Sequence, residues 1–138
     1  MDEFTPFMRF GDVIQQDDNS APQTVLQINN NVIIDSLVVD EGTYLFFGNV
    51  SIIENDPDSQ LDFYLNVYGG PTIDSASYNG TNKSRVTLIG VGEVPKQDQQ
   101  DPNYPISVRI VGGQYNGSIQ ARVKSRIVAM KIEGFKEV

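Results

Sequence analysis

The chain has 138 residues with a formal net charge of -8, and it contains neither cysteine nor histidine. The lack of cysteine excludes disulfides and thiolate metal sites, and the lack of histidine removes the commonest general base and the commonest metal ligand. Net negative charge disfavours non-specific binding to nucleic acid. We therefore expect one domain without a cofactor, with no nucleic-acid partner, and large enough to bury its own core.

No stretch of the sequence approaches the roughly 18 apolar residues that a bilayer-spanning helix needs, so we expect no membrane insertion. The first residues include Asp2 and Glu3, where a signal peptide would be basic, and no apolar region follows them. These features predict a short protein made in a cytoplasm without a signal peptide.

Residues 1–22 are predicted to form an irregular N-terminal arm that precedes a single domain at 23–138. The arm begins with the aromatic residues Phe4, Phe7 and Phe10 and continues into a polar stretch. An apolar head on a polar stem suits an arm that docks on a partner. In the alternative interpretation, the three phenylalanines cover the domain's own core.

From residue 23 onward, apolar and polar residues alternate in short runs, which is the pattern of strands with one buried face. Turn residues such as Asn116-Gly117 separate the runs, and no segment has convincing helical periodicity. The pattern predicts an all-β protein with an antiparallel β-sandwich or barrel of about eight strands. The expected strands are 23–28, 31–39, 43–53, 61–68, 84–91, 105–111, 117–123 and 126–134.

Two long polar segments, 71–83 and 93–105, are predicted to be loops. Loops of this length are often functional. They combine tyrosine rings with amide side chains, which a sugar-binding surface uses, although the same residues also serve as ordinary loop anchors. The candidate ligand residues are Tyr78, Asn79, Asn82, Gln97, Gln100 and Tyr104.

Several strands are apolar on both faces, which indicates that a second copy covers the outer face; burial inside the chain is the alternative. The candidate interface residues are Ile33, Leu37, Phe46 and Ile52. Charge is also uneven, since residues 1–80 carry a net charge of -12 and residues 81–138 one of +4. The basic strands could meet an acidic surface of a neighbouring subunit, or both halves could simply be solvated.

The acidic segment Glu54 to Asp58 could hold a hard cation through its carboxylates. Its spacing lacks the glycine and the terminal glutamate of an EF-hand loop, so a solvated acidic turn is the simpler interpretation. No pair of acids is placed for glycoside hydrolysis any better than any two acids of the chain. The sequence thus predicts no metal site and no enzymatic activity.

Residues 41–53 (EGTYLFFGNVSII) resemble the Gly-x-Tyr-x-Phe strand of the C1q and tumour necrosis factor-like jelly rolls. Residues 61–68 (LDFYLNVY) are similar to the strand that follows it in that family. Residues 125–132 (SRIVAMKI) are similar to the last strand of related trimeric domains on bacteriophage fibres, spikes and capsids. The resemblance covers about residues 23–134 and implies a jelly-roll sandwich that assembles as a homotrimer.

Because no stalk or secretory signal precedes the domain, the resemblance favours a virion protein over an extracellular animal ligand. The expected function is that of an auxiliary or decoration protein on a viral capsid, of bacteriophage type, located in the virion and bound to other virion proteins. One alternative is a receptor-binding tip for host attachment, which recognises a host-surface glycan through the two long loops. The other is a bacterial extracellular C1q-like binding module.

Overall fold

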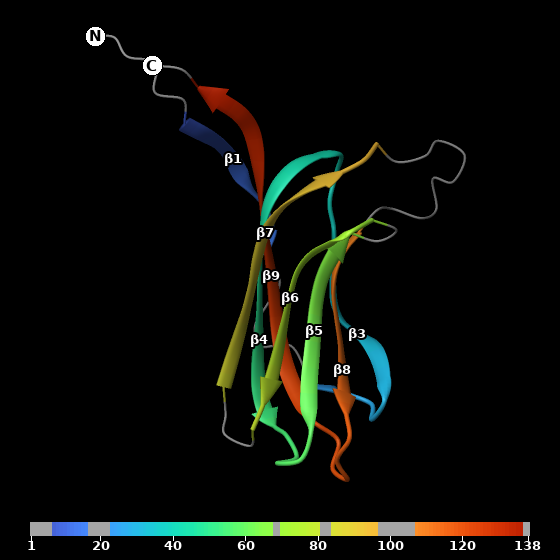
Figure 1. Ribbon diagram of the computed structural model, residues 1–138. Coiled ribbons are helices and arrows are strands. Elements are labelled where there is room, and N and C mark those ends of the chain that lie inside the picture. Colours follow the sequence, from blue (N-terminus) through green and yellow to red (C-terminus); the bar gives the residue numbers. More distant parts are fainter. Residues whose placement is uncertain (1–6, 17–22, 68–69, 81–83, 97–106, 137–138) are drawn as a thin grey trace.

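The computed structural model describes residues 7–16, 23–67, 70–80, 84–96 and 107–136. Within these ranges the chain is all-β, and its strands form two antiparallel sheets that face each other as a β-sandwich (Figure 1). The strands are β1 (Phe7–Gln16), β2 (Thr24–Val25), β3 (Asn30–Val38), β4 (Gly42–Glu54), β5 (Gln60–Val67), β6 (Thr72–Asn79), β7 (Ser84–Val94), β8 (Ser107–Tyr115) and β9 (Arg122–Lys136). The predicted fold class, an antiparallel β-sandwich, is confirmed.

The two sheets are built from strands that are distant in the sequence. Sheet A has the order β1-β9-β4-β7, and the short strand β2 also pairs with β9. Sheet B has the order β3-β8-β5-β6. From β2 to β9 the chain crosses between the sheets at every connection except β5 to β6. The central strands of both sheets are therefore placed by long-range pairing.

Strict alternation along β4 builds the centre of the core. Tyr44, Phe46 and Val50 point between the sheets and are fully buried, whereas their neighbours along the strand are only half-buried. The rings of Tyr44 and Phe46 stack with centroids 5.4 Å apart. Phe63 on β5 reaches the same core from sheet B. The core thus uses one face of each sheet and leaves the other face outside.

The segment 71–83 contains a strand where the sequence predicted a loop. Thr72–Asn79 forms β6, an edge strand that pairs with β5. Its small polar residues suit a strand whose outer face meets water, and this composition concealed its alternation. The Asp74 carboxylate accepts a hydrogen bond from the Ile89 backbone N–H at 2.9 Å, which ties β6 to the edge of sheet A.

The strand expected to end at residue 111 continues through Gly112 and Gly113, and β8 ends at Tyr115. A side chain at Gly112 would come within 2.5 Å of Ile34 and 2.8 Å of Phe63. Glycine is therefore required here by close packing in the core and not by a turn. The turn predicted at Asn116-Gly117 is confirmed, with positive φ angles of 64° and 95°. The strand expected at 117–123 is mostly this connection, and β9 begins at Arg122.

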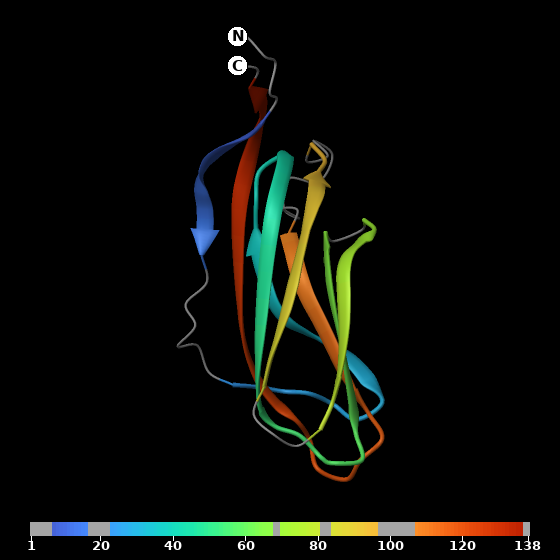
Figure 2. The same ribbon diagram turned by 60° about the vertical axis from the view of Figure 1, so that its left-hand side comes forward.

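The N-terminal arm is not irregular throughout, since residues 7–16 form β1 along the second half of β9. β9 is 15 residues long, and its last part extends beyond β4 (Figure 2). Its free edge offers unpaired N–H and C=O groups, which β1 satisfies. The pairing has several register shifts between Arg9 and Gln15, so the ladder is interrupted rather than continuous.

Candidate interaction surface

The outer face of sheet A carries large apolar side chains on three adjacent strands. Phe47 on β4 pairs with Ile89 on β7 and Val128 on β9, and two residues earlier Leu45 pairs with Val91 and Met130. Because side chains alternate across a strand, all six share the outer face. We call them the apolar patch: Leu45, Phe47, Ile89, Val91, Val128 and Met130.

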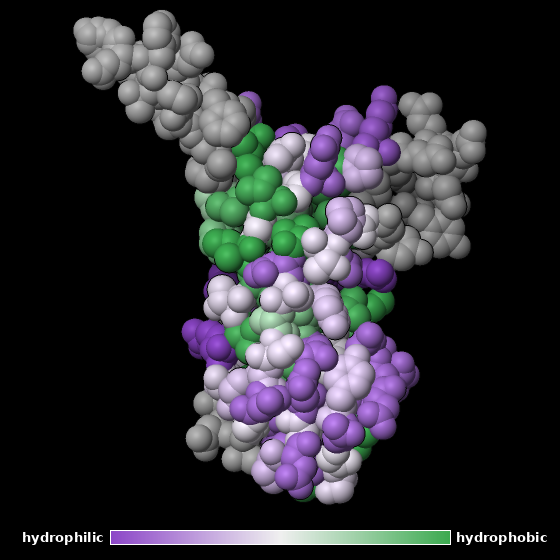
Figure 3. Space-filling model, in the orientation of Figure 1, coloured by the Kyte–Doolittle hydropathy of each residue, from purple (hydrophilic) through white to green (hydrophobic). Residues whose placement is uncertain are grey.

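No other layer of the described chain covers the apolar patch. Ile89 and Val91 are 48% and 53% exposed, and the other four members are half-buried. Figure 3 shows apolar side chains gathered over the upper part of the sandwich on the side of β4 and β7, with polar side chains below them. An exposed, contiguous apolar area of this kind is typical of interaction surfaces.

The lower half of the same outer face is basic. One register step beyond the apolar patch, Asn49 lies between Thr87 and Arg126, and at the next step Ser51 lies between Arg85 and Lys124. We call Arg85, Lys124 and Arg126 the basic row. None of the three forms a salt bridge with an acid among the described residues, and the Arg126 Nε is buried without a hydrogen-bond partner.

Arg122, at the foot of β9, has a local partner: its Nε lies 3.4 Å from a Glu54 carboxylate oxygen, with both side chains about half exposed. An exposed pair of this kind contributes little to stability. The contrast with the basic row is informative, because three cations in a chain of net charge -8 lack the acidic neighbour that the composition would readily provide.

The residues predicted to form the subunit interface lie mostly in the core. Leu37, Phe46 and Ile52 are 1%, 0% and 2% exposed within the single chain, which leaves no surface for another subunit to contact. The prediction is therefore wrong for these three. They point between the two sheets, and the residues that are free to contact a neighbour are the alternate ones on the same strands. Ile33, on the edge strand β3, is 54% exposed.

In the acidic turn after β4, Glu54 and Asp58 are exposed, whereas Asp56 is buried and structural. Asp56 is 4% exposed. One of its carboxylate oxygens accepts hydrogen bonds from the backbone N–H of Ser118 at 2.7 Å and of Ile119 at 3.2 Å, and the other accepts from Asp58 N–H at 3.0 Å. Hydrogen bonds from Ser118 and Asp58 lower the pKa of Asp56 from 3.8 to about 2.

Gln114 completes this polar end of the sandwich, at the bottom of Figure 1. Its side chain is fully buried. The amide donates to the Ile119 carbonyl at 2.6 Å and accepts from the Ala121 N–H at 2.7 Å. Asn55 donates to the Gly80 carbonyl at 2.9 Å. These contacts hold three connections of the sandwich together. Sequence reasoning missed them because a side-chain bond to a backbone group has no signature in the sequence.

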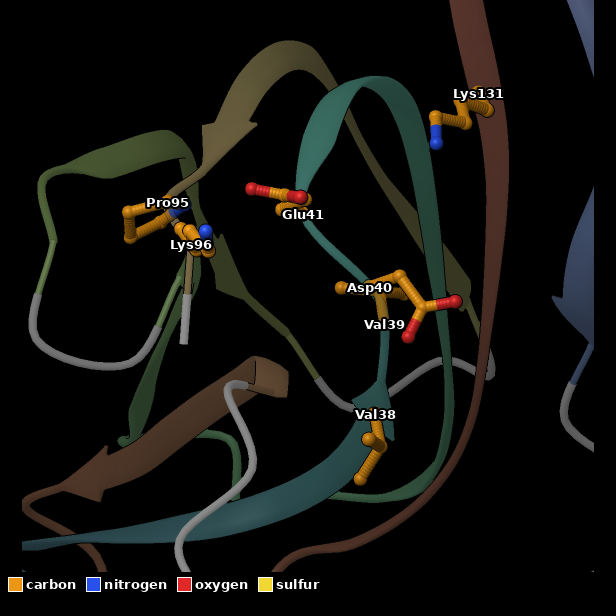
Figure 4. Close-up of a pocket in the computed structure, with 7 residues that line it drawn as sticks. All are labelled: Val38, Val39, Asp40, Glu41, Pro95, Lys96 and Lys131. Carbon is orange, nitrogen blue, oxygen red and sulfur yellow. The ribbon is translucent and has the colours of Figure 1, made fainter. Parts of the chain in front are cut away.

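At the opposite end, a cleft of about 470 Å³ lies beside the connection from β3 to β4 (Figure 4). In this view the carboxylates of Asp40 and Glu41 lie between Lys96 and Lys131. The Tyr44 hydroxyl donates a hydrogen bond to the Asp40 backbone carbonyl at 2.9 Å. The pKa of Tyr44 is raised, mainly by burial and to a smaller extent by the negative charge of Asp40. Acids and lysines balance here, so the cleft favours no ligand charge. Its lining is Val38, Val39, Asp40, Glu41, Pro95, Lys96 and Lys131.

Of the six predicted sugar-binding residues, the structure describes Tyr78 and Asn79. Tyr78 is on β6, half-buried against the core, and Asn79 is exposed at the end of that strand. The other four lie outside the described residues: Asn82, Gln97, Gln100 and Tyr104. Phe4 also lies outside them, and Phe7 and Phe10 are placed only by the backbone of β1.

Within the described ranges, no group of three or more acidic residues is arranged to hold a metal ion. The same ranges contain no helix long and apolar enough to cross a membrane. In the connection between β4 and β5, the buried Asp56 carboxylate binds backbone N–H groups. The Asp56 carboxylate at this end of the sandwich therefore stabilises the fold.

No family model matches the chain, and no curated protein matches it. Among solved structures, it is similar to part of VP2 from infectious bursal disease virus. The VP2 subviral particle has 11% identity and a TM-score of 0.47, covering 95% of this chain and 34% of that chain. The Gx strain structure has 13% identity and a TM-score of 0.40, covering 96% and 34%. The chain thus spans about a third of those proteins, and similarities this weak assign it to no family.

Proposed function

We propose that this chain is a non-enzymatic structural protein of a virus particle, a homotrimer with a jelly-roll fold that decorates the capsid. The strand order supports the jelly roll. From β2 to β9, four strands form β2-β9-β4-β7 and the other four form β3-β8-β5-β6. Such an arrangement, with eight strands divided between two sheets by repeated crossings, is that of a double Greek key.

The observation that carries the self-association is the apolar patch. Burying a large apolar side chain contributes about 1.5–3 kcal/mol, so six half-covered or exposed ones provide a substantial driving force. Association must also offset the lost freedom of the subunits, and only the surplus appears as affinity. A patch across three adjacent strands, bordered by polar side chains, has the apolar core and polar rim of a protein interface.

A structural role also fits the use that the chain makes of its buried polar groups. Asp56 and Gln114, which in an enzyme would be candidates for chemistry, are saturated by backbone donors and acceptors. They fix one end of the sandwich. A rigid sandwich with an apolar outer face on sheet A suits a protein that binds an assembled capsid lattice.

Particles with and without the protein test this function. A decoration protein binds the assembled lattice and not the free subunits, so it stabilises the particle by mass action. We expect particles that lack it to break at a lower temperature while they still adsorb to cells. A receptor-binding tip predicts the opposite result, with normal particle stability and lost adsorption, and that outcome would overturn the decoration role.

A further inference from the structure

A closed trimer requires two different surfaces on each subunit. In a ring of three, the contact is heterologous, so the outer face of sheet A on one copy must meet some other region of the next copy. That second region should offer exposed apolar side chains, to match the apolar patch, and acidic side chains, to match the basic row.

The edge strand β3 has the required apolar residues. Ile33 and Val38 are 54% and 52% exposed, and β3 has sheet partners on only one side, through β8. Their register opposite Val111 and Ser107 places both on the outer side of sheet B. Apart from these two and the apolar patch, the large exposed apolar residues of the described chain are Val25 and Ile119, on two separate elements.

The acids follow directly. Asp40 and Glu41 are both exposed in the connection that leaves β3. The hydrogen bond from Tyr44 to the Asp40 carbonyl holds this connection, and Gly42 provides its φ of 144°. Lys96 and Lys131 line the same cleft, but neither carboxylate forms a salt bridge with a described cation. The β3 edge (Ile33, Val38, Asp40 and Glu41) thus carries unpaired acids, just as the outer face of sheet A carries unpaired bases.

We propose that the β3 edge of one copy docks on the outer face of sheet A of the next, an inference that rests on the proposed trimer. Ile33 and Val38 cover the apolar patch, and Asp40 with Glu41 meets the basic row. The dimensions agree: Ile33 to Glu41 spans about 26 Å and Leu45 to Ser51 about 20 Å at ~3.3 Å per residue. The pairing explains how subunits of net charge -8 associate without placing like charges together.

Charge reversal on both surfaces tests the pairing. The variant Arg85→Glu with Lys124→Glu should weaken the trimer at least about tenfold in a sedimentation dilution series at moderate salt. Asp40→Lys with Glu41→Lys should weaken it similarly, and the four substitutions together should restore association to within about threefold of the unmodified protein. Circular dichroism checks that each variant is folded. Arg85→Glu alone, at an exposed position, repeats the test if the first variant misfolds.

The acid-to-lysine variant carries its own control for general charge effects. It changes the formal net charge from -8 to -4, so relief of overall repulsion would make it associate more tightly than the unmodified protein. Our pairing requires weaker association. A tighter or unchanged trimer in this variant, or a combined variant no better than either parent, would refute the pairing. An unmodified protein that sediments as a monomer would instead refute the proposed trimer itself.

Discussion

The outer faces of the two sheets are built from the same kind of strand, yet they differ in how they meet water. On sheet B, the exposed residues bond to one another: the Asp62 carboxylate accepts hydrogen bonds from Gln60 at 2.9 Å and from the Ser77 hydroxyl. On sheet A, the corresponding positions hold Phe47, Ile89 and three cations without acidic partners. The β5–β6 part of the sheet B face thus satisfies its polar groups within the single chain, whereas the sheet A face has the composition of an interface with another molecule.

The largest effect should come from the inner side of sheet A. Phe46 is fully buried, whereas Phe47, the next residue, lies on the outer face. Phe46→Ala should lower the free energy of unfolding by about 3–5 kcal/mol, because it leaves a cavity in the core. Urea denaturation measures this. Phe47→Ala is the matched control, measured on the monomer. If it lowered the free energy of unfolding as much as Phe46→Ala does, the inner and outer faces of β4 would not differ as described.

The polar end of the sandwich provides the next test. Gln114→Leu keeps the volume but leaves the Ala121 N–H and the Ile119 carbonyl buried without partners. We expect a loss on the order of 2 kcal/mol in the free energy of unfolding, since unsatisfied buried polar groups are costly. Thermal denaturation compares this variant with Gln60→Leu, whose exposed amide should matter much less. Equal stability of the two variants would contradict a structural role for Gln114.

Asp56 adds a dependence on pH. Its pKa is lowered from 3.8 to about 2, so the folded protein favours the charged carboxylate. The stability from this shift is therefore fully present above about pH 4 and is lost as the pH falls toward 2. Asp56→Asn should remove that part of the acid dependence. Denaturation midpoints measured between pH 2 and pH 6 would show parallel curves for both proteins if Asp56 were not involved.

The smallest expected effect concerns sugar binding. Tyr78 is half-buried on β6, where it packs against the core, so Tyr78→Ala should reduce stability by about 1 kcal/mol and leave adsorption of particles to cells unchanged. Asn79→Ala, at an exposed neighbouring position, serves as the comparison. Lost adsorption in either variant, with stable particles, would favour the receptor-binding tip.

The sequence predicted the parts of the fold that depend on local pattern. Alternation located β4, β5 and β7, and Asn116-Gly117 located a turn. Alternation also showed that β4 is apolar on both faces, but it did not show which face is inside. The candidate interface therefore included Phe46 and omitted Phe47. A shift of one residue exchanges the two faces of a strand, so only the tertiary pairing could decide between them.

The remaining misses have other physical causes. β6 has small polar residues because it is an edge strand, and it is held by Asp74 across to β7, a contact between distant residues. The expected strand ended before Gly112 because glycine serves both turns and close packing, and the sequence alone does not distinguish the two uses. β1 depends on the free edge of β9, which exists only once sheet A has formed.

Sedimentation equilibrium of the unmodified protein beside Phe47→Asp tests the central claim, that the outer face of sheet A is a self-association surface. At micromolar concentration the unmodified chain should have about three times the mass of the 15.3 kDa subunit. Phe47→Asp should sediment as a folded monomer, because a charge in the middle of the apolar patch cannot be buried against another copy. A monomeric unmodified protein, or a Phe47→Asp variant that remains trimeric, would contradict the account.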